Sequence, residues 1–187
     1  YGFPSVSNGA DADGTHEYWQ AFPAGAEIGA GDVYVIAHPS ADPSIVDQSD
    51  HTHVYLSNGD DGYALVYGSE SAYEVIDRIG DFGADPGDGW PVAGIADATK
   101  DHTLVRKLAV TAGNADWSVS SGTTAADSEW IVLPQNTWDH LGSRGSSDPS
   151  GLTPDAGGET GGSGSSGNAG TAAPLFFSEY AEGSSNN

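Results

Sequence analysis

The sequence predicts an all-β sandwich. Short runs rich in aromatic and β-branched residues recur along the 187-residue chain, and Gly, Asp and Pro steps that favour turns separate them. Stretches with helical potential are broken by Gly and Asp before they reach two turns. Many short strands with frequent turns are typical of two packed sheets rather than of a helical or α/β domain.

The expected strands of the first half follow in order. Residues 17–22 form a short aromatic run, and residues 31–38 form a stronger one that ends at Pro39. Residues 53–56 and 63–67 flank the segment Ser-Asn-Gly-Asp-Asp-Gly at 57–62. Its Asn-Gly and Asp-Gly steps predict a hairpin turn between these two strands.

The second half continues the pattern. Residues 73–79 alternate polar and apolar positions with period two, which predicts a strand with one buried face. Residues 104–110 and the short run 130–133 are further strand candidates. Single helical turns are expected at 44–48 and 136–141.

The domain organisation predicted is a sandwich over residues 1–144, a Gly/Ser/Pro-rich tether over 145–173 and a separate terminal strand within 174–187. The tether lacks core-forming side chains, so we expect a flexible linker. A lone strand on such a linker is stable only when it pairs with a sheet. The assembly strand predicted in this way consists of Leu175, Phe176, Phe177, Ser178, Glu179 and Tyr180.

Several motifs together resemble bacterial lamin-tail-like domains, which are immunoglobulin-like β-sandwiches of secreted and surface proteins. The matching segments lie at 57–65, 75–80, 85–90, 103–107, 111–114, 128–130 and 137–142. The resemblance implies an immunoglobulin-like β-sandwich. The family's opening strand resembles residues 176–187, so the chain looks circularly rearranged, and the strand that should follow next has no counterpart.

Three explanations of the displaced strand stay open at this point. Each copy donates the strand to the next copy by strand addition, or the chain is one window of a tandem array, or the strand folds back on its own domain. The expected reach of the tether permits all three.

The composition excludes some partners. Five basic residues against 27 acidic ones give a net charge of −22. Such a surface repels nucleic-acid phosphates and anionic membranes, so we expect neither as a partner. There is no Cys and no Met, and the chain begins with Tyr1, which indicates a processed product or a piece of a longer precursor. An extracellular or cell-surface location is expected.

Acidic turns are the candidate ion sites, and calcium is the candidate ion. Asp11 and Asp13 lie in an Asp-Ala-Asp-Gly turn that lacks the glutamate of an EF-hand, and Asp60 and Asp61 lie in the 57–62 turn. Asp85 and Asp88 form a similar pair. Ordinary turn-forming Asp is the competing interpretation. The spacing of His51 and His53 suits a transition metal, but no third ligand is evident nearby.

Catalytic motifs are absent: no Gly-x-Ser-x-Gly elbow occurs, and no enzyme is predicted. Trp130 is expected in the core, while any exposed Trp could stack on a glycan. Arg106 and Lys107 are expected to pair with carboxylates.

The function predicted is that of a structural subunit of an extracellular filament or surface assembly, a homopolymer joined head-to-tail by strand donation. The alternative is a binding or adhesion module for glycan, matrix or calcium-dependent contacts in a secreted multidomain protein.

Overall fold

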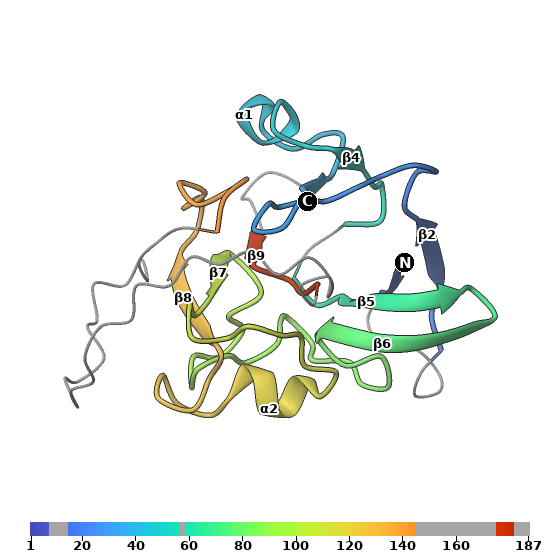
Figure 1. Cartoon of the computed structure of the whole chain (residues 1–187). Helices are drawn as coiled ribbons and strands as arrows, with labels where there is room; N and C mark the ends of the chain where they lie inside the picture. The colour runs from blue at the N-terminus through green and yellow to red at the C-terminus, as the bar shows by residue number, and fades with distance from the viewer. Residues whose placement is uncertain (8–14, 57–58, 145–174, 182–187) are drawn as a thin grey trace, which may run out of the picture.

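A computed structural model describes residues 1–7, 15–56, 59–144 and 175–181 (Figure 1). Within these ranges most strands lie in antiparallel sheets, and the helices are α1 (Pro43–Val46) and α2 (Trp117–Ser121). The prediction of an all-β fold is confirmed. Neither helix of these ranges has the length or apolar character to cross a membrane.

The larger sheet has four strands in the order β2-β1-β5-β6. Its strands are β1 (Gly2–Val6), β2 (Tyr18–Ala21), β5 (Gly62–Ser69) and β6 (Ala72–Ile79), and all neighbours are antiparallel. The smaller sheet has the order β8-β7-β9, formed by β7 (His102–Arg106), β8 (Trp130–Pro134) and β9 (Glu179–Ala181). The terminal strand β9, red in Figure 1, is thus the edge neighbour of β7.

A short parallel pair completes the strands of the described ranges. It consists of β3 (Ile36–Ala37) and β4 (His51–Thr52).

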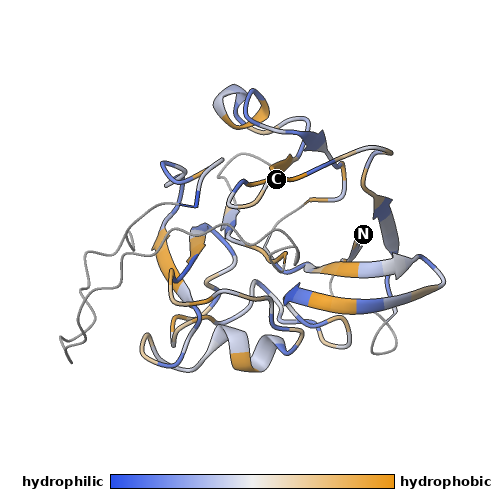
Figure 2. Ribbon diagram, in the orientation of Figure 1, coloured by the Kyte–Doolittle hydropathy of each residue, from blue (hydrophilic) through white to orange (hydrophobic). Residues whose placement is uncertain are grey.

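The main hydrophobic cluster joins residues of both sheets. Phe3 and Tyr63 come from the larger sheet, and Leu104 and Trp130 come from the smaller one. A second cluster of Val6, Ala64, Val66 and Phe82 involves the alternate positions of β1 and β5. The first five residues of β5 are therefore all buried, and Figure 2 shows hydrophobic stretches on β5, β6 and β8.

Two predicted strands are wrong or much shorter. Of residues 31–38 only Ile36–Ala37 is a strand, because Val35 bonds instead to the loop before β4: its amide donates to Asp50 Oδ2 at 2.8 Å and its carbonyl accepts from the amides of Asp50 and His51. Residues 53–56 do not form a strand, and β4 ends at Thr52.

The predicted hairpin turn between 53–56 and 63–67 is also wrong, since β4 pairs with β3 while β5 pairs with β1 and β6. The described residues of this loop form hydrogen bonds with residues that follow β6. Thr99 Oγ1 donates to the carbonyl of Gly59, and Trp90 Nε1 donates to that of Asp61 at 3.0 Å. At Gly59, with φ +87°, a Cβ would lie 2.7 Å from the backbone of Lys100, so only glycine fits this approach.

Other differences are local. Strand β1 escaped prediction because it contains Pro4, yet its pairs with β5 lie at Gly2, Ser5 and Val6, on either side of the missing amide. Helix α2 begins at a cap where Asp116 accepts from the amides of Ser118 and Val119, a four-residue signal too short to stand out.

The remaining predicted elements are closer to the structure. The strands expected at 17–22, 63–67, 73–79 and 130–133 correspond to β2, β5, β6 and β8, and the turn expected at 44–48 corresponds to α1. The strand expected at 104–110 ends at Arg106, and residues 136–141 form turns rather than a helix.

Candidate functional site

The C-terminal segment 175–181 lies in a slot formed by the rest of the chain. Only its last three residues form a strand, which is shorter than the predicted strand from Leu175 to Tyr180. β9 pairs antiparallel with β7 in the register Thr103↔Ala181, Leu104↔Tyr180 and Val105↔Glu179. The amide of Arg106 extends this pairing by donating to the carbonyl of Ser178 at 2.9 Å. We call this arrangement, lined by β7, Asp77, Phe3 and Tyr63, the strand slot.

Aromatic side chains of the segment enter the main core. The ring of Phe177 meets that of Phe3 edge-on with centroids 6.0 Å apart, and Tyr180 lies 6.1 Å from Tyr63. Both are half-buried and pack against the cluster that joins the sheets. The segment therefore contributes to the core as well as to a sheet edge.

The floor of the slot is a buried ion pair. Asp77 and Arg106 both have side chains with no exposed surface, and Arg106 Nη1 lies 3.2 and 3.0 Å from the two carboxylate oxygens of Asp77. The amides of Arg78 and Asn114 also donate to Asp77 Oδ1, at 3.0 and 2.9 Å. The amide of Phe177 donates to Oδ2 at 2.8 Å, so the docked segment supplies one of the bonds that hold this carboxylate.

The network continues behind Arg106. Its Nη2 donates to Glu129 Oε2, while Asn114 Nδ2 donates to Glu129 Oε1 at 2.9 Å. Gly113 allows this loop to approach, because a Cβ there would lie 2.5 Å from the carbonyl of Ile76.

Phe176 is held by cations. The guanidinium of Arg144 lies 4.5 Å from the centre of its ring, and that of Arg106 lies at 5.9 Å. Arg144 is itself fixed by donating to the carbonyls of Lys107, Leu108 and Val110. Arg144 and Phe176, which lie on either side of residues 145–174 in the sequence, thus contact each other at the slot.

Burial shapes the titration of the slot. Burial raises the pKa of Asp77, while the charge of Arg106 and the amides of Asn114 and Phe177 oppose that rise. Burial, followed by repulsion from Asp139, raises the pKa of Glu179 to about 7. His53, whose ring lies edge-on to Phe3, has its pKa lowered by burial and by the neighbouring His51 and His38.

Of the predicted ion ligands, the structure describes Asp60 and Asp61. Asp11, Asp13 and the tether 145–173 lie outside the described residues. Asp60 and Asp61 are buried, and Asp61 Oδ2 accepts from the hydroxyl of Tyr63 at 3.0 Å. Burial, with the charges of Asp61 and Asp85, raises the pKa of Asp60.

No group of three or more His, Asp or Glu side chains in the described ranges is arranged to hold a metal ion. His51 and His53 each have a buried Nε2 atom without a hydrogen-bond partner there.

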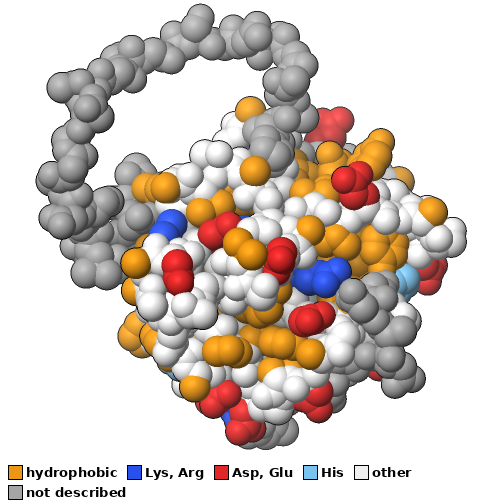
Figure 3. All heavy atoms as spheres, turned by 90° about the horizontal axis from the view of Figure 1, so that it is seen from below, with side chains coloured by type: hydrophobic (Ala, Val, Ile, Leu, Met, Phe, Trp, Pro, Cys, Tyr) orange, Lys and Arg blue, Asp and Glu red, His pale blue; other side chains and the backbone are white. Residues whose placement is uncertain are grey.

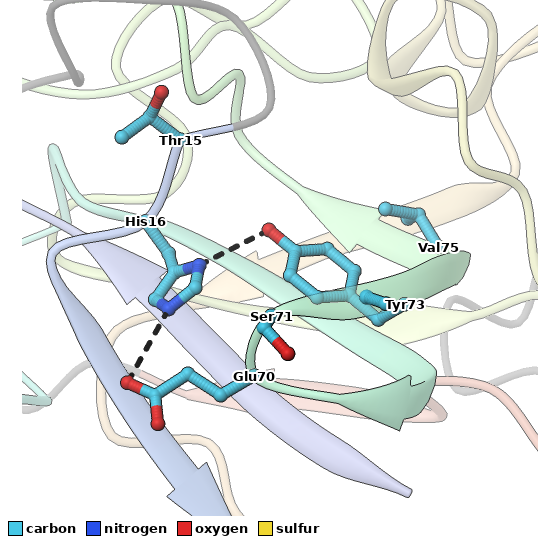
Figure 4. Close-up of a pocket in the computed structure, with 7 residues that line it drawn as sticks. Thr15, His16, Glu70, Ser71, Tyr73 and Val75 are labelled. Carbon is cyan, nitrogen blue, oxygen red and sulfur yellow. Dashed lines mark hydrogen bonds and ion pairs between the residues drawn. The ribbon is translucent and has the colours of Figure 1, made fainter.

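A separate open pocket of about 500 Å³ lies beside the turn between β5 and β6 (Figure 4). His16 Nδ1 lies 3.1 Å from the hydroxyl of Tyr73, and its Nε2 lies 3.9 Å from Glu70 Oε1. The rings of His16, Trp19 and Tyr73 contact one another at 5.6 Å. Sequence reasoning did not select this group of aromatic and polar residues.

Most of the tryptophan side chains are buried. Trp90, Trp117 and Trp130 are buried, which confirms the expectation for Trp130, and Trp19 and Trp138 are half-buried. On the face in Figure 3, acidic side chains are scattered among hydrophobic and uncharged atoms.

Sequence reasoning selected the segment and expected Arg106 to pair with carboxylates, but it missed Asp77, Glu129 and Arg144. One signal was present in the sequence: Asp77 interrupts the apolar positions that alternate along residues 73–79. The structure shows that Asp77 is fully buried.

No protein-family model, curated protein or solved structure matches this chain. The likeness to lamin-tail-like domains therefore rests on the sequence motifs alone.

Proposed function

We propose that this protein is a structural subunit of an extracellular filament or surface assembly, in which the strand slot of one copy receives the segment 175–181 of the next. One observation carries the proposal: the amide and ring of Phe177 complete a buried ion pair and a core that belong to residues 1–144. A slot that needs an inserted strand is the receptor half of strand addition.

The same contacts serve within one chain or between copies. Thirty residues, 145–174, separate the segment from Arg144. A tether of this length gives an intramolecular strand an effective concentration on the order of millimolar. Exchange between copies is therefore favoured where the local concentration of subunits exceeds that value. Because a donated strand makes a head-to-tail contact, exchange that does not close into a ring builds a filament.

The fold within this proposal is an immunoglobulin-like sandwich of the lamin-tail type. Its two faces are the sheets β2-β1-β5-β6 and β8-β7-β9, and the shared cluster of Phe3, Tyr63, Leu104 and Trp130 supports that arrangement.

The proposed setting is outside the cell, without enzymatic activity. A net charge of −22 and the lack of Cys support it. The charge keeps finished assemblies apart, and divalent cations such as calcium bundle them by screening.

A disulfide trap tests the proposal, since the natural chain has no Cys. Thr103 and Ala181 face each other across β7 and β9, next to the pair Leu104 and Tyr180. The double variant Thr103→Cys/Ala181→Cys is oxidised over a range of protein concentrations and run on a non-reducing gel. Exchange predicts a covalent ladder that grows with concentration.

Each single-Cys variant is the matched control, because it gives at most a disulfide-linked pair. A double variant that yields only an internally closed monomer at every concentration contradicts strand exchange. Deletion of 174–187 is the second test: it should abolish assembly, and assembly that survives the deletion also contradicts the proposal.

The alternative, a binding or adhesion module, is favoured by the pocket beside His16. The aromatic ring of Tyr73 with the polar His16 and Glu70 of the pocket lining suits a sugar ring. A panel of soluble glycans followed by Trp fluorescence tests it, with His16→Ala expected to abolish binding and His140→Ala, remote in sequence from the pocket, as the control.

A further inference from the structure

One oxygen of a carboxylate on the docked strand is buried without a donor. Glu179 is the first residue of β9, and it lies opposite Val105 of β7. Its Oε1 atom is buried and has no hydrogen-bond partner in the parts of the chain that the structure describes. An ionised carboxylate removed from water without a donor is far less favourable than a neutral carboxylic acid at the same place. The position of Glu179 therefore disfavours its ionised form.

The charges around Glu179 add to this effect. β7 places the uncharged Val105 opposite it, and the guanidinium of the next residue, Arg106, is engaged by two other carboxylates. Asp139, in the turn region after β8, acts on Glu179 by repulsion. Burial first, and then Asp139, raise the pKa of Glu179 from 4.5 to about 7.

We propose that the C-terminal segment docks with Glu179 as a neutral carboxylic acid, so that uptake of a proton controls engagement of the strand slot. The inference rests on the docking that the proposed function uses, and it adds a regulation of that site. Acidification fills the slots, whereas a rise in pH weakens the seating of the strand in its own chain or in a neighbour.

Docking and proton uptake are linked through the two states of Glu179. Undocked, Glu179 is exposed to water and titrates near 4.5, while docked it titrates near 7. The contribution of the neutral acid is complete below the lower value and is lost as the pH rises through the upper one. Across that interval the docking constant falls by up to roughly a hundredfold.

Amide hydrogen exchange of the full chain, read by NMR, measures docking directly. The amide of Phe177 donates to Asp77, and the amide of Arg106 donates to Ser178, so both are protected only while the segment is seated. Protection is compared between the parent and Glu179→Gln at each pH from 5.5 to 8.5. Gln has the shape of the neutral acid and does not titrate. Because His53 and Asp77 titrate in both proteins, comparison at equal pH isolates the effect of Glu179 on protection.

We expect the ratio of protection in E179Q to protection in the parent to rise by roughly tenfold or more between pH 5.5 and pH 8. Asp47→Asn, which removes an exposed carboxylate at the end of α1, should give a ratio of one throughout. A ratio for E179Q that does not change with pH overturns the inference.

A second variant leaves the segment untouched. Asp139→Asn removes the repulsion and should raise protection of both amides at pH 7; unchanged protection there also counts against the inference. Protection of the amides of β5 and β6 reports whether the domain stays folded. If E179Q loses protection at these amides as well, the result for D139N alone tests the inference. Because protection reports seating within or between chains, absence of assembly refutes only the proposed function, and a flat ratio refutes only the proton linkage.

Discussion

The backbone amide of Phe177 donates a 2.8 Å hydrogen bond to the carboxylate of Asp77, 100 positions earlier in the chain. The bond makes the terminal segment and the ion pair beneath it dependent on each other. Without the segment, a buried carboxylate loses a donor, and without the carboxylate, the amide of a half-buried residue has no acceptor.

Loss of the Asp77 charge should destabilise the whole domain. Asp77→Asn leaves Arg106 buried with only Glu129 to balance it, and we expect the free energy of unfolding to fall by about 3–5 kcal/mol. Urea unfolding at pH 7 measures the change. The double variant Asp77→Leu/Arg106→Met should recover part of the loss while leaving the Phe177 amide open to exchange. Parent-like stability of D77N would contradict this account.

The two adjacent phenylalanines should contribute unequally. Phe177→Ala removes a ring from the core and should cost roughly 2 kcal/mol, less than a fully buried Phe because it is half-buried. Phe176→Ala loses its contacts with two guanidinium groups, about 1 kcal/mol. Val119→Ala, at a side chain that is 58% exposed, is the control, expected within about 0.5 kcal/mol. Equal losses at positions 176 and 177 would argue against the seating described.

His53 should make the protein sensitive to acid. Burial and the nearby His51 and His38 lower its pKa, so the folded state resists protonation that the unfolded state accepts. Its contribution to stability is complete above the ordinary pKa of 6.5 and is lost as the pH falls below it. His53→Phe keeps a ring beside Phe3 and should reduce the drop in melting temperature between pH 7 and pH 5. An identical drop in the variant and the parent would exclude His53 as the cause.

Shortening the stretch 145–174 should favour exchange between copies. Deletion of residues 148–173 leaves four residues between Arg144 and Leu175, and such a short connection strains closure within one chain. Light scattering should then report dimers or larger species at concentrations where the parent is monomeric. Deletion of ten residues, 155–164, is the milder control and should leave the parent's behaviour unchanged. A monomeric short variant that keeps its segment seated would show that closure is unstrained.

Neutralising the buried Asp60 should stabilise the fold, and calcium is one means of neutralising it. Burial and the charges of Asp61 and Asp85 raise the pKa of Asp60, so its ionised form weakens the fold above that pKa. Asp60→Asn should raise the melting temperature at pH 7 by a few degrees, and calcium should do the same for the parent but not for the variant. A parent whose melting temperature does not differ between calcium and chelator excludes this site.

The sequence allowed prediction of strands whose own pattern carries the signal. The alternation of residues 73–79 and the apolar run of β8 predicted their strands because side-chain burial there is local information. The hairpin at 57–62 failed because turn chemistry does not say which strand receives the chain, and Thr99 and Trp90 decide that from a distance. Pro4 concealed β1 for a similar reason, since only the pairing with β5 shows that its missing amide is tolerated.

The site was half predictable. The segment from Leu175 to Tyr180 stands out because it is apolar after a long stretch without core residues. The residues that bind this segment do not stand out in the sequence. Asp77, Arg106 and Glu129 come from three separate strands or loops, and only the fold brings them together. Arg144 gave no signal, since an arginine at the end of a domain is usually a solvated charge.

The ion pair under Phe177 also bears on what the protein rejects. A strand with proline at this point has no backbone amide to donate, so it would cover Asp77 without satisfying it, and the hydrogen-bond cost would offset much of the gain from burying its side chains. An empty slot would instead hydrate its carboxylate. The slot thus rejects strands that place proline over Asp77, and it accepts a backbone amide there from any other residue.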